Sequence, residues 1–244
     1  MKMLLPLTLA LPLALSGSIQ AAVLLSDDFS SSTSGFGWAA GDSWDGGLAN
    51  GGVTVGVANP QDVSRAFATP FDASATADKL YIAFDFTQAG NGQQWGGASF
   101  FDGNNAPSGG ERFFMGDPGN IGNYGIDGYA GPSVNSTVPI ASGVTMRLIA
   151  ELDFNANGTQ STYNFWVGTS DLNAPTATAT GGGPMLSISS MRLASDGNFG
   201  PITYDNLIVA TTPGEVGLSA IPEPTSVALI GIAGAMLGFR RRRS

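Results

Sequence analysis

Residues 80–86 form one clear stretch in which apolar residues alternate with others, and this period of two is typical of an extended strand. Leu80, Ile82, Phe84 and Phe86 lie on one face of that strand, which we expect to face the core. Other short apolar runs recur along the chain, divided by turns that draw on 35 glycines and 14 prolines. No run between the two ends of the sequence has helical periodicity, so the pattern predicts an all-β fold.

The expected strands number roughly ten. They lie at residues 23–29, 53–58, 63–71, 80–86, 95–101, 112–115, 144–154, 162–167, 186–193 and 202–209. Asn157-Gly158 is a strong signal for a tight turn, so the strands on either side of it should pair antiparallel. We expect loops at 30–52, at 116–136 and in the Pro/Thr/Gly-rich stretch before 186. Many strands without helices favour a two-sheet antiparallel β-sandwich over one open sheet with exposed edges.

The first residues have the three parts of a secretory signal peptide. A short start containing Lys2 precedes the apolar residues 4–15, and residues 16–22 are small and polar. We therefore expect residues 1–21 to guide the chain through the secretion translocon and to be removed by signal peptidase. Ile19 is less typical than alanine ahead of a cut after Ala21, so a cut after Ala22 is an alternative.

The C-terminal segment, residues 221–244, combines three features without a gap. They are the triplet Pro222, Glu223 and Pro224, an apolar run at 225–239, and the cluster Arg240, Arg241, Arg242 and Arg243. The prolines exclude the triplet from a helix, so a helix must start after it. At ~1.5 Å per residue the apolar run spans about 22 Å, less than the ~30 Å hydrocarbon core of a bilayer. The arginines favour a transient insertion into the inner membrane with the C-terminus inside.

This order of Pro-Glu-Pro, short apolar helix and basic cluster resembles the PEP-CTERM sorting signal of Gram-negative bacteria that make extracellular polysaccharide. The resemblance implies that an exosortase, a membrane-embedded protease, recognises the signal and removes the helix. The protein would then reach the cell surface or the extracellular space, in contact with exopolysaccharide. The alternative is an ordinary tail anchor, which is usually longer and needs no such triplet.

Composition excludes several classes of function. The chain has 19 acidic and 10 basic residues, and half of the basic ones, Lys2 and the terminal arginines, lie in the two end segments. Nucleic acid is therefore not expected as a partner, because its phosphates need clustered lysine and arginine. The sequence has no cysteine and no histidine. Disulfides, thiol nucleophiles, Ser-His-Asp triads and imidazole metal sites are excluded with them.

Three short patterns resemble concanavalin-like and laminin-G-like jelly-roll domains. They are the opening strand ending in Asp27-Asp28-Phe29, the hairpin strand containing Trp166, and the final strand at 202–209 with its Asp205-Asn206 centre. The resemblance implies that the first and last strands lie side by side. We accordingly divide the chain into a signal peptide at 1–21, a sandwich domain at 22–210, a linker at 211–220 and the sorting signal at 221–244.

Two places are candidates for calcium, the only cofactor that the residues suggest. Adjacent first and last strands would bring together the oxygens of Asp27, Asp28, Asp205 and Asn206, which suit a hard cation. Alternatively, these side chains end strands by bonding nearby backbone. The stretch from Asp153 to Gly158 matches the first half of a calcium loop, but Asn164 stands where the glutamate belongs. We interpret that stretch as a hairpin turn.

Glu151 and Asp153 point to the same face of a strand, as the paired carboxylates of a retaining glycosidase do. The third acid usual in concanavalin-like hydrolases is missing, because Ala156 occupies its place, so we expect no catalytic residues. Trp38, Trp44 and Trp95 lie in or beside glycine-rich loops. Exposed indole rings there would stack on sugars, whereas buried ones would cap the open end of the sandwich.

Two functional hypotheses follow. In the first, the chain is an exported, non-catalytic surface or matrix protein that an exosortase-type system sorts and that stays with exopolysaccharide or biofilm. In the second, it is a lectin-like module whose loop tryptophans, with or without calcium, bind a defined glycan.

Overall fold

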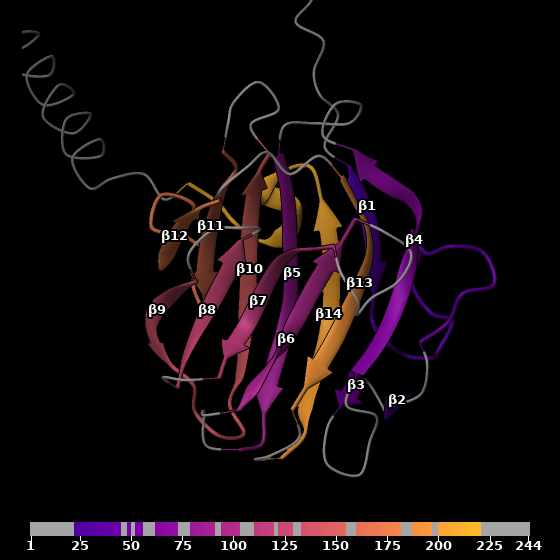
Figure 1. Ribbon diagram of the computed structural model, residues 1–244, viewed down its shortest axis with the longest axis horizontal. Helices are drawn as coiled ribbons and strands as arrows, with labels where there is room; N and C mark the ends of the chain where they lie inside the picture. Colours follow the sequence, from indigo (N-terminus) through magenta and orange to yellow (C-terminus); the bar gives the residue numbers. More distant parts are fainter. Residues whose placement is uncertain are drawn as a thin grey trace, which may run out of the picture.

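The computed structural model describes residues 22–44, 48–49, 52–55, 62–72, 79–90, 94–102, 110–119, 122–128, 133–154, 160–181, 187–196 and 200–220. Within these ranges the chain forms two antiparallel sheets packed face to face, joined by loops (Figure 1). The predicted all-β, two-sheet sandwich is confirmed.

The larger sheet has eight strands, all paired antiparallel with their neighbours. Its order is β12 (Ala177–Thr180), β11 (Thr162–Val167), β10 (Thr145–Asp153), β5 (Lys79–Gln88), β14 (Ile202–Ala210), β3 (Gly52–Val55) and β2 (Leu48–Ala49), and β1 (Val23–Asp27) also pairs with β14.

The smaller sheet has six strands and is antiparallel throughout. Its order is β4 (Asp62–Asp72), β13 (Ser187–Ser195), β6 (Trp95–Phe101), β7 (Glu111–Pro118), β8 (Asn123–Gly128) and β9 (Val134–Pro139).

Two predicted pairings are confirmed. β10 pairs with β11 from Leu148 opposite Val167 to Asp153 opposite Thr162, although the Asn157-Gly158 turn itself lies outside the described residues. β1 lies beside β14, with Asp27 opposite Leu207. The first and last strands of the sandwich are therefore neighbours, as the jelly-roll resemblance implied.

The predicted loops were partly wrong, because each contains strands. The 116–136 stretch holds the end of β7, all of β8 and the start of β9, the stretch before 186 holds β12, and the stretch before Gly52 holds β2. In β8 the buried Tyr124 and Ile126 alternate with residues that include Gly125, so the strand shows only two large apolar residues. The helix expected at 225–239 lies outside the described residues, within which no helix is long and apolar enough to cross a bilayer.

The main core lies between the two sheets, and the predicted even-numbered face of β5 is part of it. Leu80, Ile82, Phe84 and Phe86 are all fully buried there. The opposite face of β5 is buried as well, which the alternation did not predict. A second apolar cluster lies on that outer face and consists of Tyr81, Ala83, Ile149, Trp166, Ala210, Val216 and Leu218.

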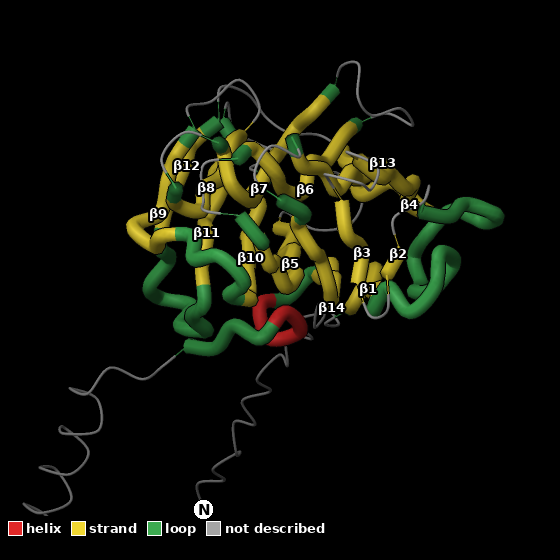
Figure 2. Tube along the Cα trace, turned by 90° about the horizontal axis from the view of Figure 1, so that it is seen from below, coloured by secondary structure: helices red, strands yellow, loops and turns green. Residues whose placement is uncertain are grey.

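The segment 211–220, which we expected to be a linker, covers this second cluster. It contains the short 3-10 helix η1 (Pro213–Val216), which Figure 2 shows against the outer face of the large sheet. Val216 and Leu218 are each only 2% exposed. Ser219 donates its backbone N–H to the Ser170 carbonyl at 2.9 Å, and its own carbonyl accepts from Leu172 at 3.0 Å. The domain therefore extends to Ser219.

Candidate functional site

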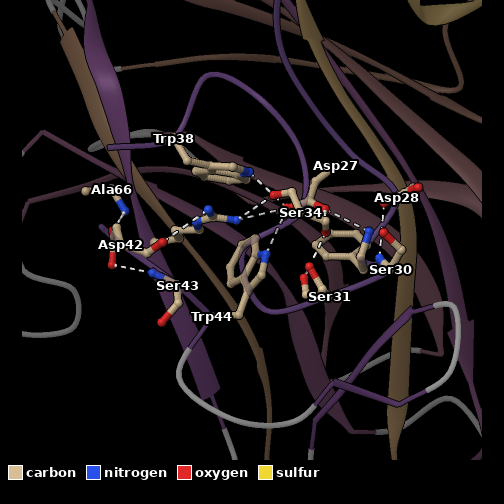
Figure 3. Close-up of polar contacts among 12 residues, drawn as sticks. Asp27, Asp28, Ser30, Ser31, Ser34, Trp38, Asp42, Ser43, Trp44 and Ala66 are labelled. Carbon is tan, nitrogen blue, oxygen red and sulfur yellow. Dashed lines mark hydrogen bonds and ion pairs between the residues drawn. The ribbon is translucent and has the colours of Figure 1, made fainter. Parts of the chain in front are cut away.

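Asp27, at the end of β1, is the centre of the densest polar cluster near the predicted site residues (Figure 3). The residue is only 2% exposed. Five donors surround the two oxygens: the Phe29 backbone N–H at 2.7 Å, the Ser34 hydroxyl at 2.6 Å, the indole N–H groups of Trp38 at 2.9 Å and Trp44 at 3.0 Å, and the Arg65 guanidinium at 3.2 Å. These contacts occupy both carboxylate oxygens with protein donors.

Arg65 supplies the positive charge of this cluster from β4 of the opposite sheet. It also donates to the carbonyls of Ser34 at 2.9 Å and Asp42 at 3.2 Å. Burial lowers the pKa of the Arg65 guanidinium, and the charges of Asp27 and Asp42 oppose that shift. The Asp27–Arg65 ion pair thus joins the edge strands of the two sheets through the segment 28–44.

The two loop tryptophans pack inside this cluster. Trp38 is 7% exposed and Trp44 is 2% exposed, and their rings meet edge to face at 5.0 Å. The Arg65 guanidinium carbon lies 4.7 Å from the Trp38 ring centre, a cation–π distance. Because protein atoms cover both rings, this arrangement corresponds to the capping alternative for Trp38 and Trp44.

The other residues of the calcium hypothesis lie apart from this cluster. Asp28 is exposed and accepts a hydrogen bond from the Ser30 backbone N–H at 3.1 Å. Asp205 and Asn206 form a bulge in β14, where Asn206 has a positive φ of 51°. Burial raises the pKa of Asp205, and the charges of Asp85 and Asp28 raise it further. No group of three or more acidic side chains suited to a metal ion occurs in the part of the chain that the structure describes.

Arg147 balances part of that acidic bulge. It forms an ion pair with Asp85 at 3.2 Å and donates to the Asn206 carbonyl at 2.7 Å. The Asn206 side chain in turn donates to Asp85 at 2.8 Å. Of the four residues of the calcium hypothesis, Asp27 therefore lies in the buried ion-pair cluster, Asp28 in the exposed turn after it, and Asp205 and Asn206 in the bulge of β14.

Trp95 differs from the other two tryptophans because it is only partly buried. It begins β6, whose even-numbered Ala98 and Phe100 face the core, so Trp95 lies on the outer face of the small sheet. One side of its ring stacks on Phe114 at 5.6 Å, and the Arg192 guanidinium carbon lies 5.6 Å from its centre. Among the predicted glycan-binding residues, Trp95 is therefore the least buried.

Glu151 and Asp153 lie on one face, as expected, and both contact Lys79, at 3.0 and 3.4 Å. Glu151 also accepts hydrogen bonds from the Tyr81 hydroxyl at 2.6 Å and the Asn164 amide at 3.0 Å. Burial opposes the ionisation of Glu151, but these donors outweigh it and hold its pKa below the ordinary value. A carboxylate held ionised in this way is poorly suited to donate a proton as a glycosidase acid.

Sequence reasoning missed Arg65, although the sequence contains a signal for it. Val63, Arg65 and Phe67 alternate along β4 and all three are buried, so the arginine occupies an apolar position of the pattern. A charged residue in such a position needs a buried partner of opposite sign. The sequence does not identify that partner, which lies 38 positions away.

Comparisons with known proteins support both resemblances. Residues 220–243 match the PEP-CTERM protein-sorting motif. The globular domain of T. cruzi calreticulin is similar in structure, with a TM-score of 0.50 and 11% identity over 80% of this chain and 90% of that one. This likeness shows the jelly-roll fold. No curated protein matches the sequence.

A carbohydrate recognition domain and a lectin are also similar in structure, at lower scores. The carbohydrate recognition domain of Emp46p in its metal-free form has a TM-score of 0.45 and 13% identity, covering 68% of this chain and 85% of that domain. Lectin II from Ulex europaeus has a TM-score of 0.44 and 13% identity, covering 72% of this chain and 97% of the lectin.

Proposed function

We propose that this chain is an exported, non-catalytic surface or matrix protein that an exosortase-type protease processes and that remains associated with exopolysaccharide. The observation that carries the proposal is the PEP-CTERM motif at 220–243, which begins directly after Ser219, the last residue with a backbone hydrogen bond to the sandwich in the part of the chain that the structure describes. A folded domain that is followed directly by a sorting motif has the organisation expected of an exported protein with a C-terminal sorting signal.

The chemistry of the domain supports a non-catalytic role. The sequence offers no histidine or cysteine, and the carboxylate pair Glu151 and Asp153 is engaged with Lys79. Lys79 is the only lysine of the chain outside the signal peptide. Hydrogen bonds and charges from those acids, acting against burial, raise its pKa, which opposes a role as a nucleophile.

Processing at both ends is the direct test. We expect the mature protein extracted from the cell surface to begin near Ala22 or Val23 and to lack the residues from about Thr225 onward, because the short helix follows the Pro-Glu-Pro triplet at once. Intact-mass measurement of the extracted protein gives both ends. A Glu223→Ala variant is the matched control and should keep the uncut tail. Recovery of Phe239 and the arginines in the mature wild-type protein would contradict exosortase processing.

A lectin-like role, with or without calcium, is the second candidate. The ring of Trp95 on the outer face of the small sheet, beside Arg192, favours it, because an aromatic face next to a guanidinium suits a sugar ring.

Binding and turnover can be separated in one assay. We expect purified 22–220 to sediment with the producer's own polysaccharide while releasing no reducing ends, since many weak contacts retain it. Hydrolysis that Glu151→Gln abolishes would contradict the non-catalytic role. Tight binding of one oligosaccharide that EDTA or Trp95→Ala removes would instead identify the lectin.

A further inference from the structure

One end of the sandwich interior contains polar side chains that lack partners. Gln88, Asp117 and Tyr124 are each 0% exposed. Asp117 Oδ1 accepts the Gly119 backbone N–H at 2.8 Å, whereas its Oδ2 has no hydrogen-bond partner. Both polar atoms of the Gln88 amide and the Tyr124 hydroxyl are likewise unpartnered. A buried polar group that is left without a hydrogen-bond partner lowers the stability of the fold.

The strand pattern directs these three side chains toward the same space. Gln88 follows Phe84 and Phe86 on the inner face of β5, and Asp117 follows Phe113 and Met115 on the inner face of β7. Tyr124, on β8, is itself part of the core. Its ring lies 5.7 Å from the Phe86 ring, which places it across from the end of β5. Polar side chains from both sheets therefore lie at the same end of the interior.

Electrostatics at this end favour a positive charge. Burial raises the pKa of Asp117 to about 6, and the charge of Asp196 raises it further, whereas the Gly119 backbone N–H and the nearby Gln88 side chain lower it. Burial, with a contribution from the Asp117 charge, raises the pKa of Tyr124 to about 12, so its hydroxyl stays neutral. None of the ion pairs formed by the described residues includes Asp117.

We propose that Gln88 Oε1, Asp117 Oδ2 and Tyr124 Oη bind a monovalent alkali-metal cation such as Na⁺ inside the sandwich. All three proposed ligand atoms are oxygens, which hard cations prefer. A single carboxylate balances one positive charge, whereas a divalent ion would leave a buried net charge, which is costly. The site is separate from Asp27, Asp28, Asp205 and Asn206.

Thermal unfolding of 22–220 in different chloride salts at one ionic strength tests this site. At a salt concentration about ten times the Kd, linkage predicts an unfolding midpoint about 3 to 6 °C higher in NaCl or KCl than in tetramethylammonium chloride, whose cation is too large to enter. Asp117→Asn keeps the shape of the side chain and should abolish this difference. Asp62→Asn, which removes an exposed charge from the end of β4, should retain it.

A second measurement does not depend on the folding of a variant. Crystals of wild-type 22–220 soaked in RbCl should show anomalous scattering within about 3 Å of Asp117 Oδ2, since alkali cations bind oxygen near this distance. Equal midpoints in all three salts would overturn the proposal. A rubidium-soaked crystal with only ordered water between Gln88, Asp117 and Tyr124 would overturn it as well.

Discussion

Replacement of Asp27 by alanine is expected to destabilise the domain by about 3 to 5 kcal/mol, the range for breaking a buried ion pair by removal of one partner. The reason is the geometry of its carboxylate, which receives two indole N–H groups, a hydroxyl, a backbone N–H and the Arg65 guanidinium. Without it, Arg65 keeps its charge in a site where its side chain is 4% exposed. The Trp38 and Trp44 N–H groups lose their acceptor at the same time.

The neighbouring residue provides a matched control. Asp28 is also a carboxylate in the same turn, but it is exposed and accepts a hydrogen bond from Ser30 within the turn. Urea unfolding of Asp27→Ala and Asp28→Ala should therefore give a large loss of unfolding free energy for the first and a much smaller change for the second. Similar losses in the two variants would show that the buried network contributes little.

A double variant tests whether the ion pair acts as a unit. Asp27→Ala combined with Arg65→Ala should cost less than the sum of the two single substitutions, because each single one leaves a buried group without its partner.

The sequence predicts those parts of the fold whose signal is local. The alternation along β5 and the Asn157-Gly158 signal after β10 depend on neighbouring residues. The first correctly predicted the inner face of β5, and the second correctly predicted that β10 and β11 pair antiparallel. Short strands gave a weaker signal. β8 consists of Asn-Tyr-Gly-Ile-Asp-Gly, and its place in the sheet depends on β7 and β9, with Gly116, Gly125 and Asn135 in register across the three strands.

The candidate site was harder to predict because exposure depends on distant parts of the chain. Trp38, Trp44 and Trp95 have similar glycine-rich surroundings in the sequence, yet the first two are buried against Arg65 and only Trp95 keeps partial exposure. Asp27 was correctly placed beside β14. Its ion pair with the opposite sheet was not predicted, because the partner, Arg65, is 38 positions away in the sequence and no local pattern links the two residues.

The segment 211–220 has the composition of a linker, with Thr, Pro, Gly and Ser among its ten residues. Its two apolar side chains, Val216 and Leu218, are two positions apart and give no periodic signal. The structure shows that the outer face of β5 is apolar and that this segment packs on it, since Tyr81 and Ala83 are buried in one cluster with Val216 and Leu218.

A chain that ends at Ala210 is therefore expected to be much less stable than one that ends at Ala220. Full burial of a Val or Leu side chain contributes about 1.5–3 kcal/mol, so loss of Val216 and Leu218 costs up to about 6 kcal/mol. The shorter chain would also expose the cluster around Trp166 and Ile149, and an exposed apolar patch of this kind promotes association. Urea unfolding and light scattering of 22–210 and 22–220 measure both effects.

Point substitutions in the longer chain separate the packing of this segment from its length. Leu218→Ala is expected to cost about 2–5 kcal/mol, as other buried leucines do, whereas Glu215→Ala in η1 changes an exposed side chain and should have little effect. Equal stability of 22–210 and 22–220 would mean that 211–220 is a linker after all. If Leu218→Ala reproduces most of the truncation, the segment belongs to the folded domain, and a cut within the Pro-Glu-Pro region would leave that domain intact.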